Sequence, residues 1–405
     1  MTAVTDAPPS VEWWREPHRR YTDGRLEFGG SDLASFAEGC ETPFFVYSAE
    51  RVRANIGRLV AALGKAGMPH RIFYAIKANR FAPLVARMRS WELCGIDTCS
   101  PAEVLYAREH GFAETDILFT GHAVSNADLD VLAAHPEVHV NCDAISTIRR
   151  LGERCPGRAI GIRINPQVGA GYHAGVHYAG GAKPSKFGLY PDRFEEALAV
   201  AASFGMRVTQ LHFHFGYGYL TQDLPRLGQA LDTSAWFMDR CPDLDTVDIG
   251  GGLGSRITED RAPLDLDAWA SLIASYLGPR GLKVHLEPGD YLMKDAGALV
   301  CEVNTIEEKA GVRFAGVNAG LGIQNLWAYY QTPFVVAPLR PRAGGSRRYT
   351  LTGNINEAID ILAEDVALPP LEEGDLIALM NAGGYGSACA SNHCMRGRFG
   401  EYLVD

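Results

Sequence analysis

Eight short apolar runs, separated by stretches with helical spacing, lie between residues 70 and 287 of this 405-residue chain. The runs are rich in β-branched and aromatic residues, which favour buried strands, whereas the stretches between them repeat apolar residues at helical intervals. Strands that alternate with helices in this way predict a closed parallel (β/α)8 barrel. The predicted strands span 70–76, 92–98, 116–120, 138–142, 159–165, 208–215, 245–249 and 283–287.

The pattern changes after the eighth run. Strand-like runs continue without long helices between them, and only 356–364 has helical spacing. We therefore expect an α/β chain with an N-terminal arm (1–24), strands that join the second domain (25–48), the barrel (49–295) and a mostly antiparallel β-barrel or β-sandwich domain (296–405). The arm is expected to be loose or docked on a partner.

Composition excludes several classes of protein. The net charge of −10 argues against a general nucleic-acid binder. No apolar run reaches the length of a membrane span, and the N-terminus lacks the basic-then-apolar pattern of a signal peptide. The nine cysteines are scattered without metal-type spacing, so we expect free thiols in a reducing cytoplasm and no metal site.

The first candidate for chemistry is Lys77, which follows the apolar run at 71–76. Barrels place their active sites at the carboxyl ends of the strands. An amine in apolar surroundings is costly to charge, and the lower pKa that results makes it a nucleophile suited to a Schiff base with a carbonyl cofactor. The alternative is a strand-end lysine whose amine reaches water.

Two histidines, His212 and His214, end the sixth predicted strand and lie on one face of it because they are two residues apart. A metal pair would need a third ligand with suitable spacing, and none follows. For His214 the functional hypothesis is an imidazole stacked on a flat ring. For His212 we favour a hydrogen-bonded histidine inside the barrel.

Glycines and a carboxylate mark the next two strand ends. Gly250-Gly251-Gly252 follows the seventh strand, where consecutive glycines let backbone N–H groups approach a phosphate, although a tight turn is the alternative. Glu287 ends the eighth strand and needs a cationic partner in the barrel mouth, either a protonated ring nitrogen or a structural ion pair. The long glycine-rich connection over 166–188 is expected to be a functional loop.

Together these strand ends resemble the pyridoxal phosphate pocket of the fold-type III decarboxylases, the diaminopimelate/ornithine decarboxylase family. The resemblance covers residues 40–400, and its motifs occur in family order. They are Tyr74–Asn79, Asp97 with Ser100 and Glu103, Arg163–Pro166, Ser185–Gly188, His212–Gly216, Gly250–Gly252, Glu287–Gly289, Asn318–Gly320, Gly353–Asp360 and Gly383–Gly386.

The resemblance implies an alanine-racemase-like barrel that binds pyridoxal 5′-phosphate. The implied reaction is loss of an amino acid's α-carboxylate as carbon dioxide, followed by protonation of the α-carbon. Lys77 would form the Schiff base, His214 would stack on the ring and Glu287 would hold the pyridinium. The other cofactor-binding residues implied are Asp97, Arg163, Gly251, Gly252, Gly289 and Tyr385.

Family members are usually head-to-tail homodimers in which residues 356–360 of one subunit complete the site of the other. The family's cysteine in this segment donates a proton, but here the residue is Asn356, followed by Glu357. An amide is no comparable acid. Another donor, such as Lys77, a tyrosine or water, is then required, or the reaction does not end in a simple α-proton.

Further departures concern the substrate. The arginines that clamp the distal carboxylate of diaminopimelate in that family are replaced by Asp290 and Leu326, and a serine after the histidine motif is replaced by Tyr217. These changes argue against diaminopimelate. Charge complementarity favours a cationic tail, and the alternative is a pocket enlarged for a bulky or carrier-tethered substrate, either of which fits a specialised biosynthetic pathway. The expected substrate-binding residues are Asp290, Tyr330, Glu357 and Asp360.

Two other functions would use the same pocket. Racemases of the alanine-racemase-like fold generally place a less acidic partner than Glu287 at the ring nitrogen. A non-catalytic pyridoxal phosphate-binding homologue conflicts with the retained Lys77, His214 and Tyr385, although Asn356 is compatible with it.

Overall fold

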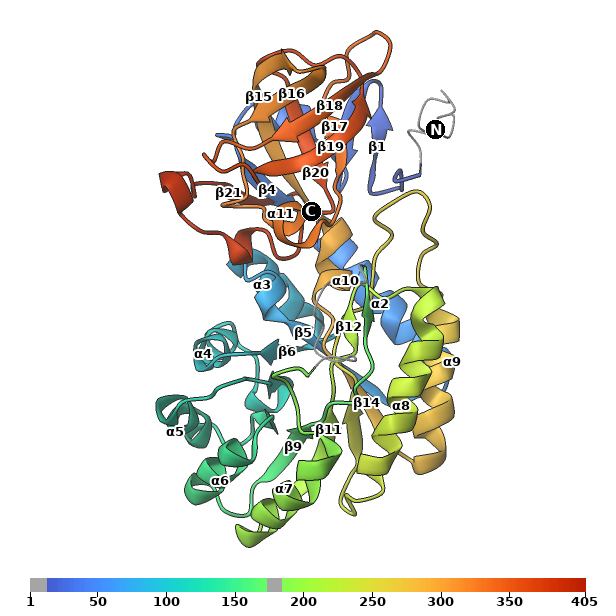
Figure 1. Cartoon of the computed structure of the whole chain (residues 1–405), viewed down its shortest axis with the longest axis vertical. Helices are drawn as coiled ribbons and strands as arrows, with labels where there is room; N and C mark the ends of the chain where they lie inside the picture. Colours follow the sequence, from blue (N-terminus) through green and yellow to red (C-terminus); the bar gives the residue numbers. More distant parts are fainter. Residues whose placement is uncertain (1–12, 173–183) are drawn as a thin grey trace. The chain divides into compact units, whose positions relative to one another are not determined.

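The computed structural model describes residues 13–172 and 184–405 (Figure 1). The chain forms two compact units. The barrel unit comprises Arg53–Ser255 and Ala262–Leu292, and the β unit comprises Met1–Val52, Arg256–Arg261 and Met293–Asp405. Within the two described ranges, no helix combines the length and apolar character needed to cross a membrane.

The barrel unit is a closed barrel of eight parallel strands, in the spatial order β11-β13-β14-β5-β6-β7-β8-β9. This confirms the predicted barrel. The first and last residues of every strand lie within three residues of the predicted ones. Barrel strands are covered on both faces, so they consist of nearly continuous apolar runs. They are β5 (His70–Ala75), β6 (Gly95–Thr98), β7 (Ile117–Phe119), β8 (His139–Cys142), β9 (Ala159–Arg163), β11 (Arg207–His212), β13 (Thr246–Asp248) and β14 (Lys283–Leu286).

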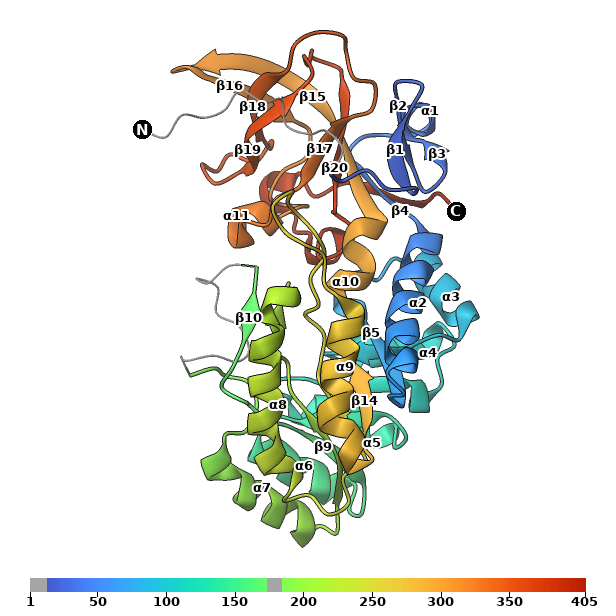
Figure 2. The same cartoon turned by 90° about the vertical axis from the view of Figure 1, so that its right-hand side faces the viewer.

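Helices connect these strands and cover the outside of the barrel (Figure 2). The hydroxyls of Ser100 and Ser125 accept backbone N–H bonds at the starts of α4 and α5, which satisfies donors that a helix end leaves free. Buried side chains such as Leu231 and Trp269 face inward. The helices are α2 (Ala49–Lys65), α3 (Ala82–Trp91), α4 (Pro101–Glu109), α5 (Asn126–Ala134), α6 (Ile145–Arg154), α7 (Pro191–Ser203), α8 (Leu224–Met238) and α9 (Leu266–Leu277).

The β unit is built on one sheet, in the order β17-β20-β15-β16-β18-β19, with β4 joined to β15 and β21. Neighbouring strands are antiparallel except in the pairs β16–β18 and β4–β21, which confirms the mostly antiparallel β part of the predicted fold class. Buried Phe44, Val300 and Met380 contribute to its core. The strands are β4 (Phe44–Tyr47), β15 (Gly297–Lys309), β16 (Val312–Val317), β17 (Val335–Pro338), β18 (Arg347–Thr352), β19 (Ile361–Leu368), β20 (Leu376–Met380) and β21 (Gly400–Leu403).

Smaller elements complete the two units. In the β unit, β1 (Arg19–Thr22), β2 (Arg25–Phe28) and β3 (Ser31–Asp32) form an antiparallel sheet beside α1 (Leu33–Ala37). α11 spans Leu326–Tyr330. In the barrel unit, β10 (Ala170–Gly171) pairs with β12 (Gly216–Tyr217). The functional loop expected over 166–188 is described only in part, since 173–183 lie outside the described residues.

The helix expected over 356–364 is wrong. Asn356–Ile359 are exposed turn residues, and Ile361 begins β19, which pairs antiparallel with β18. The apolar spacing of this stretch imitates a helix, but β18 offers β19 hydrogen-bond partners along its length. That tertiary pairing overrides the local preference.

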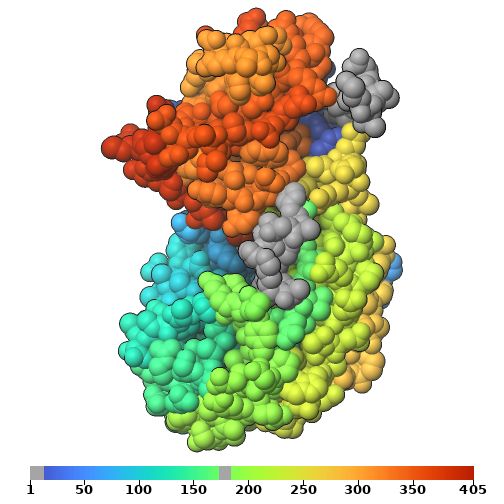
Figure 3. Space-filling model, viewed as in Figure 1, coloured from blue at the N-terminus to red at the C-terminus, as the bar shows by residue number. Residues whose placement is uncertain are grey.

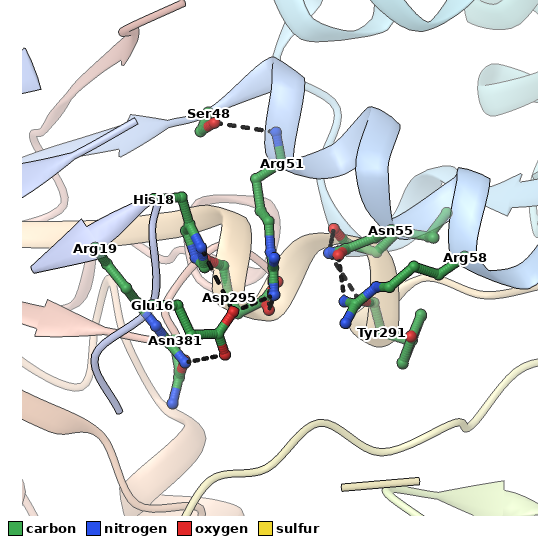
Figure 4. Close-up of polar contacts among 11 residues, drawn as sticks. Glu16, His18, Arg19, Ser48, Arg51, Asn55, Arg58, Tyr291, Asp295 and Asn381 are labelled. Carbon is green, nitrogen blue, oxygen red and sulfur yellow. Dashed lines mark hydrogen bonds and ion pairs between the residues drawn. The ribbon is translucent and has the colours of Figure 1, made fainter. Parts of the chain in front are cut away.

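The N-terminal arm docks on its own unit from Trp13 onward, so this part of the arm is not loose. The Arg51 guanidinium contacts Glu16 at 2.9 Å and Asp295 at 2.5 Å, and the Arg19 guanidinium donates to Asn381 at 2.5 Å. We call Glu16, Arg19, Arg51 and Asp295 the anchor cluster (Figure 4). Residues 1–12 of the arm lie outside the described part of the chain.

Candidate active site

The parallel strands bring four of the candidate side chains to one end of the barrel. Lys77 follows β5 directly, Asp97 lies in β6, Arg163 ends β9 and Glu287 follows β14. The charges of these groups shift one another's pKa values, so they share one site. We call this site the barrel mouth.

The Lys77 amine has two neighbours near the end of β6. It donates to Asp97 Oδ2 at 2.9 Å and lies 3.3 Å from the Cys99 sulfur. The Asp97 side chain is fully buried, and its Oδ1 has no hydrogen-bond partner among the described residues. Burial, together with the Glu287 charge, raises the pKa of Asp97 to about 8. Lys77 therefore has the partner that its setting requires, but that carboxylate is costly to keep ionised.

Glu287 is buried, and both of its carboxylate oxygens have partners. His212 Nε2 lies 3.1 Å from Oε2, and the Thr120 hydroxyl donates to Oε1 at 3.2 Å. Burial would raise the pKa of Glu287, but its hydrogen-bonded pairing with His212 and the Lys77 charge hold it well below its usual range. Glu287 therefore remains an anion, and His212 is the interior hydrogen-bonded histidine that the sequence favoured.

A third buried carboxyl group, Asp248, has no role in the sequence prediction. Its Oδ1 accepts the Gly250 N–H at 2.8 Å, and the polar atoms of His212, Asp248 and Glu287 lie within 4.8 Å of one another. No N–H or O–H donor reaches Asp248 Oδ2 in the part of the chain that is described. Burial and the Glu287 charge raise the pKa of Asp248 well above its usual value, so this carboxyl favours its protonated form.

His214 packs against the glycine run. A Cβ on Gly250 would lie 2.8 Å from His214 Nδ1, and one on Gly252 would lie 1.9 Å from the Gly216 carbonyl oxygen. Both glycines have positive φ, 68° and 85°, so a side chain is excluded by conformation as well as by space. Burial and the Arg163 charge lower the pKa of His214 to about 3, which leaves a neutral imidazole able to stack on a flat ring.

A histidine–aspartate pair in the barrel unit was missed by sequence reasoning. His122 Nδ1 lies 2.6 Å from Asp143 Oδ2, and the His122 ring meets Phe187 edge-on at 5.4 Å. Phe187 in turn lies under the Arg163 guanidinium at 4.4 Å. The Asp143 side chain is buried and His122 is 32% exposed. Both residues closely follow barrel strands, β7 and β8, which is the signal that could have found them.

Two departures from the family pattern contact each other. Tyr217 Oη donates to Asp290 Oδ1 at 3.5 Å. Asp290 is buried at the start of α10 (Asp290–Met293), and Gly289, also buried, precedes it. A Cβ on Gly251 would lie 2.2 Å from the Glu287 carbonyl oxygen, so the glycine run is packed against the same loop. A buried aspartate thus stands where the resemblance implies an arginine.

Five candidates lie on the β unit rather than in the barrel. Asn356 and Glu357 are exposed, and Glu357 pairs with His393 at 3.2 Å. Tyr330 is 43% exposed on α11, and Tyr385 is half-buried with a φ of 58°. The fifth candidate is Asp360.

Asp360, expected to bind substrate, has local backbone partners in the structure. It is buried, and its carboxylate oxygens accept the backbone N–H groups of Leu321 and Ile355, each at 2.6 Å. Because both oxygens are committed to these bonds, Asp360 holds its own loop together. The sequence could not reveal this, since Leu321 is distant along the chain.

Comparison with known proteins agrees with this geometry. The profile of the family described as "Pyridoxal-dependent decarboxylase, pyridoxal binding domain" matches residues 50–294. The diaminopimelate decarboxylase of Methanothermobacter thermautotrophicus is 35% identical over 395 residues, covering 94% of this chain and 91% of that protein. That of Pseudomonas fluorescens is 33% identical over 401 residues, covering 95% and 93%. The solved structure of the M. jannaschii diaminopimelate decarboxylase with L-lysine matches the fold with a TM-score of 0.87 at 24% identity, covering 96% and 93%.

Proposed function

The chain belongs to the pyridoxal-dependent decarboxylase family, and from this premise we propose that it decarboxylates an amino acid whose side chain ends in a cation. Membership makes it a pyridoxal 5′-phosphate-dependent carboxy-lyase of amino-acid metabolism. The cationic tail is a narrower claim, and one observation carries it: the buried Asp290 held by Tyr217.

The barrel mouth fits the cofactor. Pyridoxal phosphate supplies an electron sink for the carbon that loses its carboxylate. In our proposal Lys77 holds the cofactor's carbonyl carbon, the neutral His214 stacks on the ring, and the ionised Glu287 holds the protonated ring nitrogen. An anion at that nitrogen favours decarboxylation over racemisation. The proposed phosphate and inner-site contacts come from Gly251, Gly252, Gly289, Tyr385, Asp97 and Arg163.

The support for a cationic tail is electrostatic. A buried carboxylate repels a second carboxylate and attracts an ammonium or guanidinium group. Asp290 is such a carboxylate, at a position where the family has an arginine. The family's other arginine position holds Leu326, which is buried and apolar. Neither position offers a cation to a distal carboxylate, and the exposed Glu357 adds negative charge to its segment.

The test is carbon dioxide release from L-ornithine, L-lysine, L-arginine, meso-diaminopimelate and L-glutamate. We expect kcat/KM for a basic amino acid to exceed that for diaminopimelate by about tenfold or more. Asp290→Arg should reverse that preference. Asp243→Arg, an exposed site before the amino end of β13, makes the same charge change as a control and should not alter the preference. Diaminopimelate as the best wild-type substrate would refute the cationic tail and leave the decarboxylase assignment intact.

A carrier-tethered or bulky substrate is the competing candidate. The absence of both arginines favours it, because the pocket loses two contacts to a distal carboxylate and this loss alone does not show which group the pocket binds instead. Release from none of the free amino acids, but from an aminoacyl carrier protein, would support it.

We further propose a homodimer in which residues 356–357 complete the partner's barrel mouth. Ile359, 53% exposed, and Met395, 86% exposed, are large apolar side chains on the surface of the β unit, and such side chains favour an interface. The C-terminal segment that carries Met395 is the red surface in Figure 3.

Mixing two inactive variants tests the shared site. Lys77→Ala and Glu357→Ala subunits, each inactive alone, should form mixed dimers with one intact site. About a quarter of wild-type activity should return if subunits exchange freely. No recovery, despite exchange of subunits shown by a mass-tagged subunit, would refute the sharing.

The cytoplasmic location also stays a proposal. It is supported by the nine cysteines, all of which are free thiols in the structure.

A further inference from the structure

Decarboxylation needs an acid that protonates the carbon left by the departing carboxylate, and Asn356 cannot be that acid. The chain carries a thiol elsewhere in the site. Cys99 is the first residue after β6, two residues beyond Asp97, and the Lys77 amine contacts both its sulfur and the Asp97 carboxylate. The Cys99 sulfur lies 3.3 Å from Lys77 Nζ, and the cysteine keeps an exposed surface although the atoms packed around its sulfur desolvate the thiol.

We propose that the Cys99 thiol is the proton donor of this enzyme, so that the acid comes from the same subunit as Lys77. The inference rests on decarboxylation, which family membership provides, and not on the cationic tail.

Geometry is the first argument. Lys77 and the substrate's amino group compete for the same carbonyl carbon, so the substrate nitrogen comes to lie near the position of Lys77 Nζ. The carbon that loses its carboxylate is one bond, about 1.5 Å, from that nitrogen. A sulfur 3.3 Å from Nζ would then lie no more than about 4.8 Å from that carbon.

The surroundings of Cys99 keep the proton on sulfur. Burial raises the pKa of the Cys99 thiol to about 12, against the lowering effect of Lys77. Asp97 offers a second, independent sign that this side of the mouth binds something: its buried Oδ1 is unpartnered in the described structure. A hydrogen-bond donor on a bound ligand would satisfy that atom.

Protons and electrons balance when Cys99 and Lys77 act together. The bond between the α-carbon and the carboxylate breaks, carbon dioxide leaves, and the electron pair stays on the α-carbon. The S–H bond of Cys99 breaks and its proton forms the new C–H bond, leaving a thiolate. The Lys77 ammonium, 3.3 Å away, returns a proton to the thiolate and becomes the neutral amine that displaces the product. Solvent supplies one proton per turnover.

The main competitor is His122, which the buried Asp143 orients. A histidine–carboxylate pair can also donate protons. Variants can separate the two candidates: Cys99→Ala and Cys99→Ser remove the thiol, and His122→Asn removes the imidazole. Cys155→Ala removes a thiol at the end of α6, beside the amino end of β9, and is the matched control.

The first measurement is independent of turnover. The infrared difference spectrum between the wild-type protein and Cys99→Ala, both loaded with cofactor at neutral pH, should show one S–H stretching band that shifts to S–D in heavy water. Absence of the band would overturn the proposal, because a thiolate has no proton to donate.

The second measurement follows the products formed from L-ornithine in heavy water. Wild-type and Cys155→Ala enzymes should place one deuterium in a single prochiral position. In Cys99→Ala we expect kcat to fall about 100-fold, deuterium to appear in both prochiral positions, and a larger share of turnovers to end in aldehyde with an aminated cofactor. Cys99→Ser should show the same defects to a smaller degree.

Each result of these two measurements either supports or overturns the role of Cys99 as the proton donor. If His122→Asn shows these defects and Cys99→Ala does not, or if neither variant does, the proposal is wrong. If wild-type enzyme releases no carbon dioxide from L-ornithine, the cationic-tail proposal loses support, and the infrared band alone then supports or overturns the role of Cys99.

Discussion

The anchor cluster of the β unit and the mouth of the barrel unit both gather buried charges, and the two groups are arranged differently. In the anchor cluster the Asp295 carboxylate receives two N–H bonds from Arg51, and the Arg51 and Arg19 charges outweigh the effect of burial, so its pKa lies below the usual range. In the barrel mouth the pKa values of Asp97 and Asp248 are raised, and each has an oxygen without a partner in the described structure.

The difference separates a structural cluster from a functional one. A carboxylate matched by guanidinium groups stabilises the fold that holds it. Carboxyl groups crowded together in a low-dielectric site destabilise the protein, and such arrangements are found where a ligand or a reaction uses them. The anchor cluster should therefore affect stability, and the mouth should affect chemistry.

The largest expected effect is on chemistry. Lys77→Ala should lower carbon dioxide release by about 10³-fold or more and abolish the absorption band of the lysine-bound cofactor. The thermal melting temperature should change little, because Asp97 can take up a proton when its partner is removed. Lys65→Ala, an exposed lysine on α2, is the control. A large loss of stability in Lys77→Ala would mean that the barrel mouth, like the anchor cluster, stabilises the fold.

The next effect is on stability. Asp295→Asn should lower the free energy of unfolding by about 3 kcal/mol, because the buried Arg51 loses its anionic partner. Activity per folded molecule should be unchanged. Glu308→Gln, which breaks an exposed pair with Arg313 in the same unit, should leave stability nearly unchanged. Urea unfolding of the three proteins measures the difference.

The pH dependence of the Asp295 effect has a definite sign. Its folded pKa lies below the ordinary value of 3.8, so the carboxylate stabilises the protein above that pH. The contribution is lost as the pH falls from 3.8 toward the folded value. The gap between wild type and Asp295→Asn should therefore close in acid, and a gap that widens in acid would contradict the assignment.

The fold and the mouth follow from the sequence to different degrees. All eight barrel strands are predictable, because burial on both faces requires continuous apolar runs. Lys77, His214 and Glu287 are predictable because chemistry in barrels gathers at strand ends. Cys99 was also predictable on this ground, because it directly follows a barrel strand.

The remaining features depend on tertiary partners. Glu16, Arg51 and Asp295 are ordinary charged residues in the sequence, and only the fold shows that they meet. The sequence alone does not show that the Asp360 carboxylate accepts the backbone N–H groups of Leu321 and Ile355, because Leu321 is distant along the chain. The helix expected over 356–364 failed for the same reason, since β18 provides partners that local spacing does not reveal.

The smallest expected effect is on the stability of Asp248→Asn. It separates the barrel mouth from the anchor cluster most clearly, because this variant should be stabilised whereas Asp295→Asn should be destabilised. In Asp248→Asn the amide oxygen can still accept the Gly250 N–H, and the amide nitrogen can donate to Glu287 as a protonated carboxyl would. The folded pKa of Asp248 lies above its ordinary value of 3.8, so wild-type stability falls as the pH rises from 3.8 toward the folded value.

Asparagine does not ionise and escapes that loss. We expect the variant of the cofactor-free protein to be more stable by about 1 kcal/mol at about pH 8, and equal to wild type at about pH 4. Urea unfolding at both pH values measures this. A variant less stable than wild type at the higher pH would mean that Asp248 is an ionised carboxylate with adequate partners, as Asp295 is. The mouth would then hold no unfavourable charge for a ligand to relieve, and its buried carboxyl groups could no longer be distinguished from the anchor cluster by their electrostatics.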